Sequence, residues 1–562
     1  MENGGTVTVA DDAGFDYAVP RRVVVLDNAR AAVLVAALVI CSAAYSFEVT
    51  SFLHAKEAVL CAGLAAMALL VAVRGHFYWN GVKAFAPLWA FAGIGLARAA
   101  LMPTAVASDT ALAALRWALV LVTVALAYDL LAQEKWRDRL FDAFIVSAAV
   151  VALLGYVQYW RLAPSFFPVF DSYDQRVYSV FGNQDYFGGY VAMAFPAALY
   201  RVLGPRRRAW CAGALLLLAP ALLISGSRSS WLAALAGVCA VAPHLEWRPR
   251  GLALAALVAA VAIGATAAMA PEATVARVNS AFGEKDEGRD SRLWLWKAGH
   301  GMFTDSPLMG IGLGNYAYWS PSYLGEIAAN RPPDPSFNIE RHADQPHSEL
   351  VRVLAEAGLV GILLGAWMVA RLMPVRGPQW GVLAAYGLFA LFNGVFDSTP
   401  HTLVACLMAG MMTGKARDSF WDSRGAANLL PMAALAVCLV EVWAVITPSV
   451  RLTAAEDAEL AGRDSLVLYE RAAGLSWPCA RANKEYADAL AADGQNLEAY
   501  DEFQKALLGL DTGDIYLALA TIAVDENDLP SARSWIKQCV KRWPHNPQAR
   551  EMFILLHHRT PE

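Results

Sequence analysis

The stretch WCAGALLLLAPALLISGSRSSWLAALAGVCAVAPHL, residues 210–245, contains two apolar runs on either side of the short polar segment Ser225–Ser230. A helix that crosses a membrane needs about 20 mostly apolar residues, and each run approaches that length. The one arginine of the stretch, Arg228, lies between the two runs. The stretch therefore predicts two membrane helices that are joined by a tight turn at one membrane surface.

Apolar runs of the same kind recur along most of the chain. They lie near residues 31–47, 57–73, 84–102, 111–131, 140–160, 186–203, 210–225, 229–245, 251–270, 349–373, 379–396, 401–415 and 428–447. Apolar side chains make up 57% of the chain and charged ones only 17%, whereas soluble domains contain about 45–50% and about 25%. The sequence predicts an all-α polytopic membrane protein with about 12–13 spanning helices. It excludes a soluble globular protein.

Polar residues divide the chain into three parts. Residues 1–30 form a polar segment, and no small-residue cleavage site follows the first apolar run, so we expect a retained first helix rather than a cleaved signal. Residues 31–450 form the membrane domain, which a long polar loop interrupts at about 271–346. Charged residues become dense from Arg451 onward. This change predicts a soluble domain at 451–562.

Lysine and arginine residues indicate how the helices are oriented, because short cytoplasmic loops of membrane proteins carry an excess of them. If the N-terminus is cytoplasmic, the inside segments hold roughly four times as many as the short outside segments. This orientation places the 271–346 loop outside. With an odd number of spans it also places residues 451–562 outside. In a bacterial inner membrane the outer side is the periplasm.

The C-terminal domain contains a repeat of about 34 residues, which is typical of tetratricopeptide units. The matching pairs are Tyr469 with Ala472, Phe503 with Ala506, and Ile536 with Cys539. Such repeats form concave docking surfaces and rarely carry out chemistry, so the domain is expected to bind a protein or a growing polymer. An irregular helical domain is the alternative.

Cysteine spacing and net charge argue against several kinds of site. The 8 cysteines are scattered without a C-x-x-C pair, which gives little support to a metal centre or a disulfide framework. The net charge of −5 is small and indicates no nucleic-acid partner.

The first of three candidate motifs is the turn with Ser227 and Arg228. Ionisable residues at a membrane are costly and are therefore candidates for function. Ser227 suits the N-cap of the following helix. Arg228 then lies at a helix N-terminus, an arrangement that attracts phosphate. The alternative is an arginine that contacts lipid head groups.

The second motif is RDSRLWLWK, residues 289–297, in the outer loop. Arg292 and the two tryptophans suggest an amphipathic segment at the interface, and arginine binds phosphate through paired hydrogen bonds. A structural surface arginine is the alternative. The glycines of the downstream segment 310–316 resemble a nucleotide loop, but no strand precedes them, so a dinucleotide site is rejected.

The third motif is DQPHSE, residues 344–349, directly before an apolar helix. Asp344 or a neighbour is expected to cap that helix, with Pro346 in its first turn. His347 then lies at the mouth of the helix, where it can accept a proton from an attacking hydroxyl. A structural histidine is the alternative, and a metal pair with His342 lacks a third ligand.

Together these motifs resemble the O-antigen ligase/polymerase superfamily. The family pattern H-[S/N/Q]-x9-G-x-x-G matches His347-Ser348 followed by Gly358-Leu-Val-Gly361. The family's arginine turn matches residues 225–231, and its loop arginine matches Arg292. The similarity covers roughly residues 150–415, and the repeat tail departs from a minimal ligase.

The resemblance implies a glycosyltransferase at the periplasmic face of the bacterial inner membrane. It implies that Arg228, Arg292 and Ser227 bind the pyrophosphate of an undecaprenyl-pyrophosphate-linked glycan. His347 orients or deprotonates the acceptor hydroxyl for an inverting attack. No metal or other cofactor is then needed, because fixed cations and helix N-termini supply the electrostatics.

The acceptor stays open among three classes: lipid A core (a ligase), a lipid-linked repeat (a polymerase) and a protein side chain (a protein O-oligosaccharyltransferase). Two other kinds of protein are the alternatives. A transporter or flippase usually shows duplicated halves and midplane charges, which the sequence lacks. A membrane-anchored scaffold leaves the arginine and histidine motifs unexplained.

Overall fold

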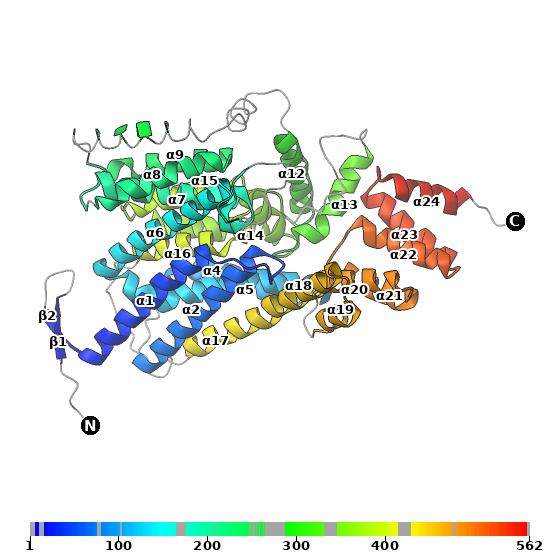
Figure 1. Cartoon of the computed structure of the whole chain (residues 1–562), viewed down its shortest axis with the longest axis horizontal. Coiled ribbons are helices and arrows are strands. Elements are labelled where there is room, and N and C mark those ends of the chain that lie inside the picture. Colours follow the sequence, from blue (N-terminus) through cyan, green and yellow to red (C-terminus); the bar gives the residue numbers. More distant parts are fainter. Residues whose placement is uncertain are drawn as a thin grey trace.

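The computed structural model describes most of the chain. The described residues are 6–10, 16–75, 80–101, 104–163, 176–206, 208–246, 287–330, 345–413, 429–475 and 479–558, with isolated positions between 249 and 264. Figure 1 shows a layered body of helices, from which the C-terminal helices project at one end. The fold is all-α, as predicted, apart from a short antiparallel hairpin of β1 (Thr6–Ala10) and β2 (Asp16–Pro20).

The helical body contains a helix at each described apolar run. Its elements are α1 (Arg21–Ala43), α2 (Phe52–Arg74), α3 (Asn80–Ala84), α4 (Ala86–Ala99), α5 (Thr104–Leu131), α6 (Glu134–Tyr159), η1 (Ser179–Phe181), α7 (Gln184–Leu203), α8 (Trp210–Ile224), α9 (Arg228–Val241), η2 (Ala242–His244), α14 (Glu349–Leu372), α15 (Gln379–Ala390), α16 (Thr399–Thr413) and α17 (Leu429–Glu441). The run at 251–270 lies largely outside the described residues.

Six helices in the described part of the chain are long and apolar enough to cross a membrane. They are Arg21–Ala43, Phe52–Arg74, Thr110–Leu131, Glu134–Tyr159, Glu349–Leu372 and Leu429–Leu460. Trp210–Ile224 is a shorter apolar helix. The polytopic membrane fold is thereby confirmed, whereas the number of about 12–13 spans stays a prediction.

Helix α7 lies in the middle of the body and is buried along most of its length. Asn183 starts it by accepting hydrogen bonds from the backbone N–H groups of Asp185 and Tyr186. Two glycines then allow close approach, since small residues let membrane helices pack tightly. A Cβ atom on Gly188 would lie 2.7 Å from Ser225 Oγ, and one on Gly189 would lie 2.3 Å from a ring carbon of Phe389. Helix α7 therefore brings the Ser225–Ser230 turn and α15 together.

Helix α14 is broken at Gly358, which has φ +61° and ψ −155°. At the break, the polar loop packs directly on the helix backbone. The N–H groups of Leu359 and Val360 donate to the carbonyl oxygens of Pro307 and Leu308. A Cβ atom on Gly358 would lie 2.6 Å from the Leu308 carbonyl. Only glycine adopts this backbone conformation readily.

We expect Gly358→Ala to lower the free energy of unfolding by about 1–3 kcal/mol, because the backbone strain and the contact with Leu308 both oppose the new methyl group. Thermal unfolding in detergent measures the change. Gly365→Ala on the same helix is the matched control, since a Cβ atom there meets no heavy atom within 4 Å. Equal unfolding temperatures for the two variants would contradict the account.

The polar loop contributes two helices, α12 (Glu287–Asp305) and α13 (Tyr316–Ala329), and the C-terminal domain contributes a consecutive stack. The stack comprises α18 (Thr447–Leu460), α19 (Leu466–Ala473), α20 (Ala480–Ala492), α21 (Asn496–Leu507), α22 (Gly513–Asp525), α23 (Leu529–Arg542) and α24 (Pro547–His558). Residues 429–460 form one helical segment that includes the π-helix η3 (Val442–Ile446), so the expected boundary at 450 lies inside it.

The repeated pairs of the C-terminal domain fall on every second helix. They lie on α19, α21 and α23, and all six of their side chains are buried. Each helix of the stack also contacts the next one. A chain of helix pairs with a repeated core position suits the predicted helical repeat. The tetratricopeptide assignment itself stays a prediction.

The C-terminal stack packs on the polar loop. His545 Nε2 lies 3.1 Å from the Ala328 carbonyl oxygen of α13. A Cβ atom on Gly325 would lie 2.5 Å from the Arg542 carbonyl oxygen. Arg542 is itself fixed by Asp511, at 2.8 Å. The loop helix α13 and the C-terminal domain therefore lie on the same side of the helical body (Figure 1).

Candidate functional site

The arginine turn is built as a network of serines. Arg228 is the first residue of α9, and Ser227 occupies the N-cap position as predicted. The Ser227 side chain does not cap the helix, however: its Oγ accepts a hydrogen bond from Ser230 Oγ at 2.8 Å and lies 3.1 Å from Ser229 Oγ. The expected capping bond is therefore wrong, because neighbouring hydroxyl groups compete for the same oxygen. The position of Arg228 at a helix N-terminus is confirmed.

The histidine motif directly precedes α14. Ser348 is the N-cap, and its Oγ accepts from the Val351 N–H. Pro346 therefore lies before the helix, and its expected place in the first turn is wrong, because capping by Ser348 starts the helix at Glu349. His347 lies next to the cap with φ +51°, a left-handed conformation in which histidine is enriched. Asp344 and His342 lie outside the described residues.

Helix α12, which carries Arg292, contacts the histidine motif directly. Trp296 Nε1, about one turn after Arg292, donates to the Pro346 carbonyl oxygen at 3.0 Å. The Tyr316 hydroxyl of α13 donates to the Leu295 carbonyl oxygen of α12 at 2.7 Å, which joins the two loop helices. The second and third motifs are therefore joined through the residues beside Arg292 and His347.

The turn between α15 and α16, residues 391–398, contacts the first and third motifs. Asn393 Nδ2 donates to Ser229 Oγ at 2.8 Å and so reaches the arginine turn. The Phe396 N–H donates to Glu349 Oε1 at 2.8 Å and so reaches α14 beside His347. We call residues 391–398 the connecting turn. The arginine turn and the histidine motif thus both contact the connecting turn, and α12 with Arg292 joins them through Pro346.

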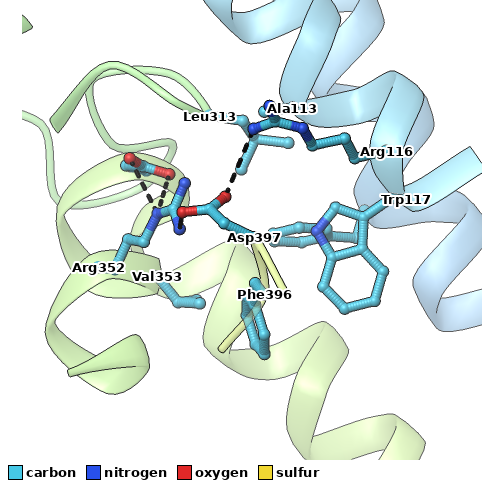
Figure 2. Close-up of a pocket in the computed structure, with 10 residues that line it drawn as sticks. Ala113, Arg116, Trp117, Leu313, Arg352, Val353, Phe396 and Asp397 are labelled. Atoms are coloured by element: carbon cyan, nitrogen blue, oxygen red, sulfur yellow. Dashed lines mark hydrogen bonds and ion pairs between the residues drawn. The ribbon is translucent and has the colours of Figure 1, made fainter. Parts of the chain in front are cut away.

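Asp397 of the connecting turn belongs to a largely buried ionic network, and Figure 2 shows its centre. Arg352 Nη1 pairs with Asp397 Oδ2 at 2.6 Å and lies 3.9 Å from Glu349 Oε1. Arg352 Nε pairs with Glu356 at 3.3 Å. Arg116 Nη1 approaches Asp397 Oδ1 at 3.8 Å from α5. Asp397 therefore lies between two guanidinium groups.

These two arginines determine the charge of Asp397. Burial by itself raises the pKa of this carboxyl group, but Arg352 and Arg116 outweigh it and hold the pKa below its ordinary value. Arg116 Nε also pairs with the fully buried Glu57 of α2 at 3.2 Å. The network consequently links α2, α5, α14 and the connecting turn by charge as well as by packing.

Glu356 fastens the glycine-rich segment 310–316 to α14. Its carboxylate accepts from the Gly314 N–H at 2.9 Å and from the Tyr316 N–H at 3.2 Å. The Ile311 N–H donates to the Ala355 carbonyl oxygen at 2.8 Å. The glycines of this segment thus allow it to pack closely on α14.

The sequence prediction missed this network, although a signal for it was present. Glu57, Arg116, Arg352 and Glu356 all lie within apolar runs that were predicted to span the membrane. Ionisable residues in such runs are rare and usually face a partner or a cavity. The prediction considered only charges at the outer boundary. The charges within the runs form the ion pairs that hold the helices around the site together.

One family comparison bears on this arrangement. Residues 212–366 match the O-antigen ligase family model. This region is therefore similar to O-antigen ligases, and the match supports the superfamily resemblance. No curated protein matches the chain.

The matched region contains Arg228, Arg292 and His347, the two loop helices and the break in α14. Asp397 and Arg116 lie outside the matched region, yet both belong to the network around Arg352, which lies inside it. The helices before and after the matched region therefore complete the surroundings of the candidate site.

Proposed function

We propose that the chain transfers a glycan from an undecaprenyl-pyrophosphate donor to an acceptor hydroxyl at the periplasmic face of the bacterial inner membrane. The observation that carries this proposal is a chain of contacts between the three segments, all within residues 212–366, which match the O-antigen ligase family model. The connecting turn contacts the Arg228 and His347 segments, and α12 with Arg292 contacts Pro346 beside His347. A diphosphate group needs fixed cations, and a hydroxyl nucleophile needs a base.

In the proposed reaction, the acceptor oxygen attacks the anomeric carbon while His347 takes the hydroxyl proton. The bond from the anomeric carbon to the pyrophosphate oxygen breaks, and that oxygen keeps the electron pair. Arg228 and Arg292 neutralise the charge that develops on the departing pyrophosphate, and Ser227 offers a further hydrogen bond. Attack opposite the leaving group inverts the anomeric configuration. The fixed cations give this reaction a metal-independent route.

The periplasmic assignment draws on two observations. Lysines and arginines gather in the predicted cytoplasmic segments. The C-terminal domain packs on α13 of the polar loop, so both belong to the same compartment, as the orientation requires. This arrangement leaves the C-terminal helices beside α13, where they suit recruitment of an acceptor or a product.

The decisive experiment is transfer by the purified full chain in liposomes that contain a labelled undecaprenyl-pyrophosphate glycan. Lipid A core, unlabelled lipid-linked repeat and a protein extract are offered separately as acceptors. We expect labelled product with one of them, and its identity separates ligase, polymerase and protein O-oligosaccharyltransferase. Absence of product with all three would overturn the proposal, and movement of the labelled lipid across the bilayer would instead favour a flippase.

A further inference from the structure

Helix α2 packs against the helical segment 429–460, and the two run in opposite directions. His54 Nδ1, near the start of α2, lies 2.9 Å from Ser449 Oγ. About two turns further along α2, the Cys61 carbonyl oxygen accepts a hydrogen bond from Cys438 Sγ at 3.4 Å. Later residues of α2 therefore meet earlier residues of the other segment. The residues between these two contacts lie at the interface of the helices.

Glu57 and Glu441 lie between those two contacts, and their side chains interact with each other. Both residues are fully buried. The Thr399 hydroxyl donates to Glu57 Oε1 at 3.4 Å, but no hydrogen-bond donor among the described residues reaches Glu57 Oε2 or either carboxylate oxygen of Glu441. A buried, ionised carboxylate without donors is costly, and two of them side by side also repel each other. One proton between the two groups reduces both costs, because a protonated carboxyl group can donate to its neighbour.

The ionisable groups that face the two glutamates supply little positive charge. Helix α5 contributes Arg116, whose Nε lies 3.2 Å from Glu57 Oε1. The same guanidinium approaches Asp397 Oδ1 at 3.8 Å, so it is divided between two carboxylates. The helices themselves add the thiols of Cys61 and Cys438, and η3 has no ionisable residue. Arg116 can neutralise one charge of the pair, and a second charge would stay uncompensated.

The position of the pair allows a proton to exchange with water. Helix α2 begins at Phe52, so Glu57 lies in the second turn of this membrane helix rather than at its middle. The side chain of Arg116, which contacts Glu57, is 30% exposed. A proton can therefore reach the pair beside Arg116 without crossing the rest of the membrane domain.

We propose that Glu57 and Glu441 form a proton-binding site, in which the pair holds one proton at neutral pH and one carboxyl group donates to the other. The pair then carries a single negative charge, which Arg116 neutralises. The bound proton stabilises the packing of the 429–460 segment on α2, and this segment leads into the C-terminal stack. The inference goes beyond the proposed transfer reaction and does not depend on it. A monovalent cation between two ionised carboxylates is the competing occupant.

Infrared spectroscopy of the full chain in detergent detects the proton directly. A protonated carboxyl group has a C=O stretching band that an ionised carboxylate lacks, and isotope labelling of glutamate assigns the band to this residue type. We expect such a band at neutral pH in the unsubstituted chain and its loss in Glu441→Gln. Asp457→Asn is the matched control, since Asp457 is an exposed acid on the same helical segment, and it should keep the band. Absence of a glutamate band in the unsubstituted chain, or an unchanged band in Glu441→Gln, would overturn the proposal.

Thermal unfolding at different pH values gives an independent measurement. The folded chain keeps a proton that a glutamate of the unfolded chain releases above about pH 4.3, so this contribution to stability is complete at lower pH and declines as the pH rises. Between about pH 6 and about pH 8, we expect the unfolding temperature of the unsubstituted chain to fall by several degrees more than that of Glu441→Gln. Equal falls would contradict the proposal. A rise of the unfolding temperature when sodium replaces choline at constant ionic strength, seen in the unsubstituted chain and lost in Glu441→Gln, would show a bound cation instead of the proton.

Discussion

His347→Ala and Arg228→Ala are expected to lower glycan transfer by at least about 100-fold while the chain still folds and inserts. A positioned general base contributes about 10²–10⁴-fold to a rate, and one fixed donor to a developing anion contributes about 10²–10³-fold. The ion pairs of Arg352 with Glu349, Glu356 and Asp397 are all kept in both variants. The measurement is the initial rate of transfer from a labelled undecaprenyl-pyrophosphate glycan, at equal amounts of purified protein.

Two kinds of control separate chemistry from folding. His557→Ala and Arg371→Ala replace exposed residues of the same types and should keep full activity. Arg228→Lys keeps the positive charge but loses the planar fork, so we expect an intermediate rate. Added imidazole should partly restore His347→Ala, because the free base can occupy the vacated space. Full activity of both alanine variants would show that the assigned roles are wrong.

Arg352→Met is expected to have the largest effect on stability. It removes the guanidinium that pairs with Asp397 at 2.6 Å and with Glu356 at 3.3 Å. Removal of one partner from a buried ion pair costs about 3–5 kcal/mol, because the remaining charges stay buried without compensation. Thermal unfolding in detergent measures the change. Transfer should fall as well, since Glu356 fastens the 310–316 segment and Asp397 belongs to the connecting turn.

Arg371→Met is the control for this substitution, because Arg371 is an exposed arginine on the same helix. Arg352→Lys should recover part of the stability, since one ammonium group can pair with Asp397 but not with Asp397 and Glu356 together. An unfolding temperature for Arg352→Met equal to that of Arg371→Met would mean that the network contributes no stability.

The secondary structure of the chain was predictable from its sequence. The apolar runs predicted the helices of the body, and the Ser227-Arg228 motif predicted a helix that begins at Arg228. These features depend on neighbours within a few residues, so the sequence itself contains the information. The Pro346 error has a similar origin, because several residues of the DQPHSE motif can start a helix and only one does.

The network around Asp397 depended on contacts between distant parts of the chain. Arg116 and Asp397 are separated by nearly half of the sequence, and no local pattern indicates that they approach each other. The same is true of Asn393, which joins the arginine turn to the connecting turn. Such pairs form only when the packing of α5, α9, α14 and α15 brings their ends together.

The sequence by itself determined a membrane-bound bundle of helices, and it predicted the side of each loop through its charges. It also contained the three motifs that bind a diphosphate or move a proton in our proposal. Tertiary structure alone decided which buried charges neutralise one another and how Gly358 allows the polar loop to pack on α14. The physical reason is that apolarity, helix starts and loop charge act over short stretches of chain. Charge pairing and cavities exist only between surfaces that the fold has already brought into contact.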